Sequence, residues 1–166
     1  GSLLQRANPA RAVIACQIDS PKTGDFWRSS VTTPSIPATV ARLRQTFDSG
    51  KTRPIEWRQA QLFELGRMMR QHEADFAEAL RLDLGKCLFE AVLTEMSFVE
   101  AEAKYASKHL ADWMRPRRVR TPMMLQPGRS YVQPESKGVA LIIAPWNYPL
   151  SMVLAPLVGA IAGGNC

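Results

Sequence analysis

Cysteine and histidine are scarce in this chain of 166 residues, which contains three cysteines and two histidines. Cys16, Cys87 and Cys166 are odd in number and widely separated, and His72 and His109 lie 37 positions apart. Disulfide frameworks and zinc clusters need closely spaced sets of such residues, so we expect neither a disulfide framework nor a metal site. A reducing, cytoplasmic location is therefore the default expectation.

Charged side chains are absent from residues 138–166, a run of 29 positions. A run of this length raises the question of a membrane span. Pro145, Pro149 and Pro156 would each interrupt a lipid-exposed helix, and Asn147 would lack a polar partner there. We therefore expect no transmembrane segment, and the N-terminus has no signal-peptide pattern. The run is typical of the buried interior of an α/β domain.

The overall composition is that of an ordinary globular protein, with 46% hydrophobic and 22% charged residues. These values exclude disordered, collagenous and low-complexity chains. The balance of 21 Lys and Arg against 15 Asp and Glu gives a formal net charge of +6. This moderate excess attracts anionic partners in general and does not select one class of them.

Residues 1–33 show no sustained periodicity, and we expect a loosely ordered leader there. A first amphipathic helix is predicted from Ser35 to Gly50, because Ser35 is a good helix cap and Pro37 suits the first turn. Its apolar positions recur at helical spacing: Ile36, Val40, Leu43 and Phe47.

A second helical stretch is predicted from about Pro54 to Gly85, with a break near His72. Its apolar face contains Leu62, Leu65, Met69, Phe76 and Leu80.

The third predicted helix has the most regular pattern and ends before Pro116. Its apolar stripe consists of Phe89, Val92, Met96, Val99, Ala103, Ala106, Leu110 and Trp113. Four glutamates of this helix allow two interpretations, a set of paired carboxylates or a solvated face: Glu90, Glu95, Glu100 and Glu102. Most of them avoid the apolar stripe, so we favour the solvated face.

Helical periodicity is lost after Arg115, and residues 116–137 are predicted to form an extended β ribbon bounded by proline-containing turns. Five arginines lie in or beside it without an intervening acidic residue: Arg115, Arg117, Arg118, Arg120 and Arg129. They raise the alternative of nucleic-acid binding. Few aromatic side chains are interleaved with them, so we do not favour a nucleic-acid partner.

The uncharged run begins with a predicted strand at 138–143 that is buried on both faces. A turn at 144–148 and a helix from Pro149 follow, and this order is the opening unit of a parallel α/β sheet. Ligands of such folds bind at the carboxyl ends of the strands, which singles out the turn. Its Asn147 allows two functions, donating hydrogen bonds to an oxyanion or capping the following helix.

Several stretches together form a specific signature. They are Asp83-Leu84-Gly85-Lys86, Glu90, Glu95, the segment 138–143, Pro145-Trp146-Asn147-Tyr148-Pro149 and Leu157-Val158-Gly159-Ala160-Ile161-Ala162-Gly163-Gly164-Asn165. This signature resembles the aldehyde dehydrogenase superfamily, and within it the class 3 branch of fatty-aldehyde and coniferyl-aldehyde types. The resemblance covers about residues 34–166 and leaves the leader unmatched.

The resemblance implies oxidation of an aldehyde to a carboxylic acid with NAD or NADP, through a cysteine thiohemiacetal. Asn147 would be the oxyanion-hole asparagine, which favours that role over a helix cap. The resemblance places the cofactor's ribose and nicotinamide against Ile143, Ala144, Pro145 and Trp146. It also implies that Tyr148 borders the aldehyde pocket.

The family's nucleophilic cysteine, its general-base glutamate and its pyrophosphate-binding turn all follow the Gly-Asn end in sequence. None of the three cysteines of this chain has a neighbourhood suited to a nucleophile. We therefore expect the N-terminal part of an aldehyde dehydrogenase that is inactive by itself, with a truncated α/β fold. Its expected divisions are a leader (1–33), a helical part (34–115), an oligomerisation-like ribbon (116–137) and the start of a Rossmann-like dinucleotide-binding domain (138–166).

The expected partners are the aldehyde and, in a full-length enzyme, a second identical subunit. The alternative is a non-catalytic module that pairs with a full-length subunit through the helices and the ribbon. In either case Leu141, Ile142 and Ile143, and the helix at 150–161, would lack sheet partners. We expect an exposed apolar patch and an aggregating or molten chain.

Overall fold

A computed structural model describes residues 35–166, which are mostly helical; the leader lies outside the described residues. The elements are α1 (Ile36–Asp48), α2 (Ile55–Gln71), α3 (Glu73–Leu84), α4 (Leu88–Ala91), a π-helical segment (Val92–Met96), α5 (Ser97–Met114), β1 (Arg117–Val119), a 3₁₀ turn (Met123–Leu125), β2 (Ser130–Val132) and α6 (Ser151–Ala162). Among these residues, none of the helices is both long and apolar enough to cross a membrane.

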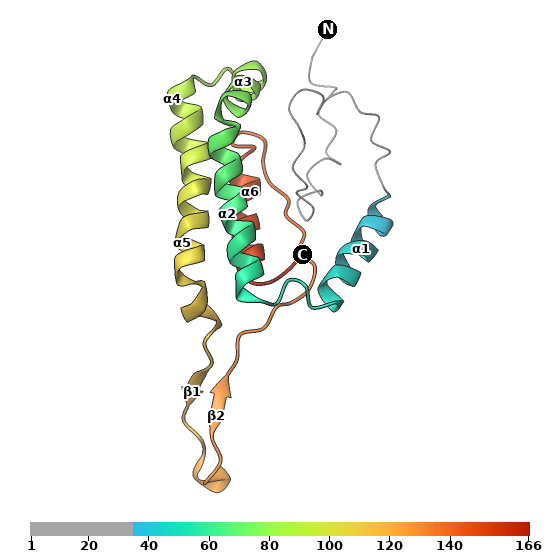
Figure 1. Cartoon of the computed structure of the whole chain (residues 1–166), viewed down its shortest axis with the longest axis vertical. Coiled ribbons are helices and arrows are strands. Elements are labelled where there is room, and N and C mark those ends of the chain that lie inside the picture. The colour runs from blue at the N-terminus through green and yellow to red at the C-terminus, as the bar shows by residue number, and fades with distance from the viewer. Residues whose placement is uncertain (1–34) are drawn as a thin grey trace.

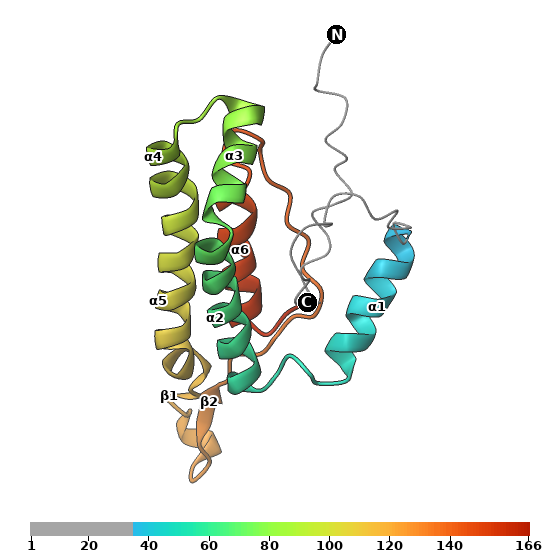
Figure 2. The ribbon, with the colours of Figure 1, turned by 45° about the horizontal axis from the view of Figure 1, so that its top comes forward.

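The core of the molecule lies between α2, α5 and α6 (Figures 1 and 2). α2 contacts α5 along its length, and α6 packs against both of them. The buried apolar side chains at their contacts include Leu62, Leu65, Met69, Val99, Ala103, Ala106, Leu110, Val158 and Ile161. The sequence predicts that α6 lacks sheet partners, and within residues 35–166 the helices α2 and α5 pack against its apolar face.

The second predicted helix is confirmed, including its break. α2 ends at Gln71, and His72 leaves helical geometry with φ −112° and ψ 24° before α3 begins. α3 ends at Gly85, whose φ of +69° is a left-handed conformation that favours glycine as a helix terminator. Leu62, Leu65, Met69 and Leu80 are buried as predicted, and Phe76 packs partly buried against them.

α1 begins as predicted, with Ser35 Oγ accepting a hydrogen bond from Ala38 N at 3.4 Å. The prediction for its apolar face is only partly right, because Ile36 and Val40 are exposed while Leu43 and Phe47 are half-buried. Both views show α1 apart from the other described helices (Figure 2).

The third predicted helix is one continuous rod made of α4, the π-helical segment and α5 (Figure 1). Its apolar stripe is buried from Met96 to Leu110, but Phe89 is 74% exposed and Trp113 is 46% exposed. A π-helical turn contains more residues than an α-helical one, so consecutive residues Glu95 and Met96 both face inward. The expectation that Glu95 faces water is therefore wrong.

β1 and β2 form an antiparallel ribbon that extends beyond one end of the helices (Figure 1). Arg118 pairs with Tyr131 at the centre of the register. At the tip, the side chains of Met123 and Met124 are 88% and 96% exposed.

The segment 138–143 is extended but is not a buried strand, which corrects the prediction. Leu141 and Ile143 are 78% and 87% exposed. Cys166 N donates to Gly138 O at 2.9 Å, and Ala140 N donates to Cys166 O at 2.7 Å. This pattern is that of two parallel strands, but it involves a single residue on one side. Within residues 35–166 the sheet consists of β1 and β2 alone.

Candidate functional site

The turn at 144–148 connects the extended segment to α6 and exposes its two most unusual side chains. Trp146 is 85% exposed, and Asn147 is also exposed. The Asn147 amide makes no hydrogen bond to any other residue of the described part. Asn147 therefore does not cap α6 and has its donors available to a ligand.

The cap of α6 comes from Glu95, which lies 55 positions before Leu150. Glu95 is fully buried, and its Oε2 accepts hydrogen bonds from Leu150 N at 2.8 Å and from Ser151 N at 3.3 Å. These N–H groups belong to the first turn of α6, where a helix has unpaired donors and a partial positive charge. A carboxylate satisfies both requirements.

Lys86 completes this arrangement. Its Nζ donates to Glu95 Oε1 at 2.5 Å, and both side chains are buried. The same Nζ lies 3.7 Å from the centre of the Tyr148 ring, a cation–π distance. A buried carboxylate and a buried ammonium group each need such a partner, because an unpaired charge is costly away from water. Lys86 thus links Glu95 to the residue that follows Asn147.

The other end of α6 is held by Arg58, a buried residue of α2. Its guanidinium donates to Thr52 O at 3.0 Å, to Ala162 O at 3.0 Å and to Ser136 Oγ at 3.4 Å. Burial lowers the pKa of Arg58 from its usual value. A cation at the C-terminal end of α6 also complements the partial negative charge there.

The Gly-Gly-Asn sequence after α6 closes the unit. Gly164 has a φ of +73°, and a Cβ at this position would overlap the Arg58 guanidinium and the Ser136 hydroxyl. Asn165 Oδ1 accepts hydrogen bonds from Lys137 N at 2.8 Å and from Gly138 N at 2.9 Å. These contacts fasten the end of α6 to the start of the extended segment, so the segment, turn and helix are fixed relative to one another.

The residues predicted to line the cofactor lie together on an open surface. Ile143, Pro145 and Trp146 are exposed, and Ala144 is half-buried. Tyr148, predicted to border the aldehyde, is half-buried against Lys86. Within residues 35–166 no cluster of three or more His, Cys, Asp and Glu side chains has the arrangement of a metal site.

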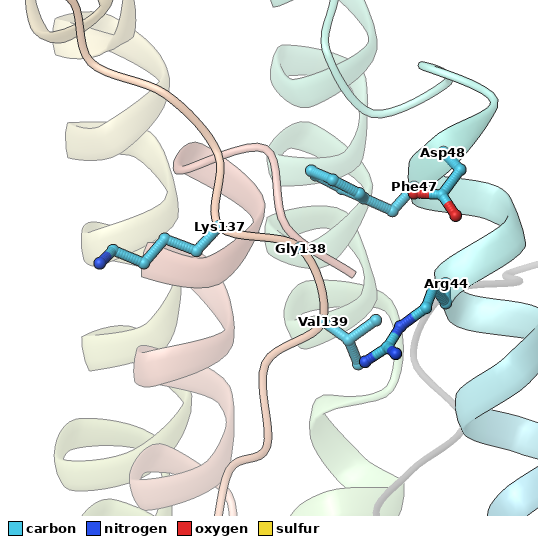
Figure 3. A pocket seen from close by; sticks show the side chains of 6 residues that line it. All are labelled: Arg44, Phe47, Asp48, Lys137, Gly138 and Val139. Carbon is cyan, nitrogen blue, oxygen red and sulfur yellow. The ribbon is translucent and has the colours of Figure 1, made fainter.

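A separate pocket of about 240 Å³ lies between α1 and the extended segment (Figure 3). It is lined by Arg44, Phe47, Asp48, Lys137, Gly138 and Val139, and the Lys137 side chain extends away from α1. Small-molecule sites usually have about 300–1,000 Å³. The pocket is smaller than that and contains none of the residues of the turn.

Comparison with known proteins adds the following. The model of the aldehyde dehydrogenase family matches residues 18–166, so the likeness begins earlier than the expected position near 34. The chain is 43% identical over 129 residues to aldehyde dehydrogenase family 3 member B2 of Mus musculus, covering 78% of this chain and 27% of that protein. It is 43% identical over 128 residues to family 3 member B1 of Homo sapiens, covering 77% and 27%.

A solved structure described as the substrate-bound state of Staphylococcus aureus AldH is also similar. It has a TM-score of 0.76 and 39% sequence identity, and the match covers 80% of this chain and 29% of that one. The chain thus spans about a quarter of the length of the relatives it matches.

Proposed function

Because this chain belongs to the aldehyde dehydrogenase family, we propose that its residues supply the oxyanion-stabilising part of an NAD(P)-dependent oxidation of aldehydes to carboxylic acids. The observation that carries the proposal is the Asn147 amide. It is exposed and makes no hydrogen bond within the described residues. The helix that follows its turn, α6, is bound at its start by Glu95 of the π-helical segment and at its end by Arg58 of α2.

The chemistry needs such a donor. When a thiolate attacks an aldehyde, the carbonyl oxygen gains negative charge, and an amide N–H aimed at that oxygen lowers the barrier. In this proposal the thiolate comes from a cysteine outside these 166 residues, since none of Cys16, Cys87 and Cys166 lies in the turn. The Asn147 amide donates to the developing oxyanion, and the half-buried Tyr148 ring borders the aldehyde.

The exposed surface of Ile143, Ala144, Pro145 and Trp146 suits one side of a nicotinamide nucleotide. Its side chains are apolar, and the backbone groups of 141–147 have no hydrogen-bond partners within the described residues. When bound, NAD or NADP would accept the hydride. Nothing in these residues favours one of the two cofactors over the other.

The proposal includes a homodimer of the whole enzyme in the cytoplasm. The exposed methionines at the ribbon tip support a contact with a second subunit, because such side chains on a protruding element favour burial in an interface. The scattered cysteines support a reducing compartment.

The same ribbon supports a second candidate function, a non-catalytic module that associates with a full-length subunit. Co-expression of the tagged chain with a full-length family 3 enzyme tests this second candidate. Stable co-purification supports the module, whereas failure to associate removes it.

The catalytic proposal is tested in a hybrid enzyme in which residues 35–166 replace the matching part of human family 3 member B1. Asn147→Ala should lower kcat by about 10²–10³-fold, the usual effect of losing one oxyanion donor, and leave the KM for the cofactor unchanged. Gln45→Ala, which removes an exposed amide on α1, is the matched control and should leave kcat unchanged. An inactive hybrid, or an Asn147→Ala variant with kcat within threefold of the parent, would overturn the proposal.

The 166-residue chain by itself should show no NAD(P)-dependent aldehyde oxidation. Measurable turnover by the purified chain would refute the assignment of the nucleophile to a residue outside it.

A further inference from the structure

The buried pair of Lys86 and Glu95 joins the loop before α4 and the π-helical segment, nine residues apart, to the start of α6, which lies 55 positions after Glu95. We propose that Glu95, held by Lys86, is a positioning residue that sets the direction of the Asn147 amide. This inference rests on the proposed function, since it assigns the pair a task in oxyanion stabilisation.

The contacts fix the turn on the C-terminal side of Asn147. Glu95 Oε2 holds Leu150 N at 2.8 Å, and Lys86 Nζ holds the Tyr148 ring at 3.7 Å. Pro149 lies between these two residues and has a fixed φ. The backbone that follows Asn147 is therefore restrained at three consecutive residues, which fixes the point from which its side chain projects.

The charges of the pair suit a site where an oxyanion develops. A carboxylate alone would cap α6 but would also place a negative charge beneath the turn, which opposes an oxyanion. Lys86 neutralises that carboxylate at 2.5 Å while Oε2 still accepts from the helix. The pair thus provides a strong cap with no net charge.

The first experiment measures coupling to Asn147 in the hybrid enzyme. Glu95→Ala should lower kcat at least tenfold and change the KM values for aldehyde and cofactor by less than twofold. In a hybrid that already carries Asn147→Ala, the same substitution should have no further effect on kcat. An equal decrease in both backgrounds would overturn the proposal, because a merely structural role does not depend on Asn147.

The matched control is Glu100→Gln, on the next turns of the same rod. Glu100 pairs with Arg70 on the surface, with side chains 36% and 50% exposed. Its substitution should leave kcat unchanged in both backgrounds. A decrease equal to that of Glu95→Ala would show that any lost ion pair of this rod has the same effect, and would overturn the assignment.

A second experiment separates the cap from the charge. Glu95→Gln keeps an oxygen acceptor for α6 but leaves Lys86 unpaired, so kcat should decrease. Adding Lys86→Met removes the unpaired charge but also the cation contact with the Tyr148 ring, so it should restore kcat only in part. The same Lys86→Met should fail to rescue Glu95→Ala, which has no acceptor. Rescue of both variants, or of neither, would overturn the proposal.

A third experiment needs no activity and uses the 166-residue chain. Hydrogen exchange at the amides of Leu150 and Ser151 should become at least tenfold faster in Glu95→Ala, while peptides of α2 keep their protection and so report an intact fold. If Asn147→Ala leaves kcat of the hybrid unchanged, the proposed function fails, but faster exchange at Leu150 and Ser151 would still show that Glu95 holds the start of α6. Unchanged exchange at Leu150 and Ser151 would overturn the positioning whatever the activity.

Discussion

Arg58 connects three segments of the described part of the chain to α2. Its guanidinium reaches the carbonyl oxygens of Thr52 and Ala162 and the hydroxyl of Ser136. Arg58→Met should lower the free energy of unfolding by about 2–3 kcal/mol, because buried acceptors that pair with a cation are left unsatisfied. Urea unfolding followed by circular dichroism at 222 nm measures this loss.

The control for this prediction is Arg67→Met on the same helix. Arg67 pairs with Glu64, and both side chains are partly exposed, at 41% and 35%. Exposed pairs contribute roughly 0–1 kcal/mol, so this variant should unfold at nearly the parent urea concentration. Equal losses for the two variants would contradict the role given to Arg58.

Asn147 was predictable from sequence, whereas its supporting residues were not. The prolines at 145 and 149 mark the turn locally, so the position of Asn147 follows from neighbours in the chain. Glu95 and Arg58 are polar residues in amphipathic helices, and periodicity assigns such residues to solvent. One signal was present: residues 138–166 contain no acidic residue, so a carboxylate that caps α6 has to come from elsewhere.

At the level of elements, α2 and α5 form the main contact of the helical core. Leu62 of α2 is 1% exposed, while its neighbour Phe63 is 62% exposed. Leu62→Ala should lower the free energy of unfolding by about 2–5 kcal/mol, because it removes buried methyl groups and leaves a cavity. The midpoint of urea unfolding reports the change.

Phe63→Ala is the matched control, since it shortens a larger apolar side chain that is 62% exposed on the same helix. Its loss should stay within about 0.5 kcal/mol, as for other surface substitutions. A larger loss of unfolding free energy for Phe63→Ala than for Leu62→Ala would show that α2 buries the face containing Phe63, which contradicts the described core.

The helices could be predicted from the sequence more reliably than the segment 138–143. α2, α3 and most of α5 were predictable because their apolar residues recur at a local spacing. The segment 138–143 has the composition of a buried strand, but a strand also needs hydrogen bonds from a distant part of the chain. Within the described residues only Cys166 provides them, so the segment stays extended and Leu141 remains exposed.

At the scale of the whole molecule, the packed helical core of residues 35–166 carries exposed apolar side chains, and two groups of them matter for association. One is the ribbon tip, formed by Met123, Met124 and Leu125. The other is the open edge, formed by Leu141, Ile143 and Trp146, where backbone groups also have no hydrogen-bond partner within residues 35–166. Because α2, α5 and α6 form a packed core, we expect the helices of the 166-residue chain to remain folded. Association through exposed surface is then the expected outcome in place of a molten state.

The open edge should dominate this association, because it combines apolar side chains with backbone groups that another extended segment can pair with. The double substitution Leu141→Ser with Ile143→Lys should shift the 166-residue chain toward monomer in sedimentation velocity at a fixed concentration, with an unchanged circular dichroism spectrum. Met124→Gln, at the 96% exposed tip residue, tests the ribbon in the same way and should leave the distribution unchanged. If Met124→Gln instead produces the monomer, the ribbon is the contact between copies and the open edge is not.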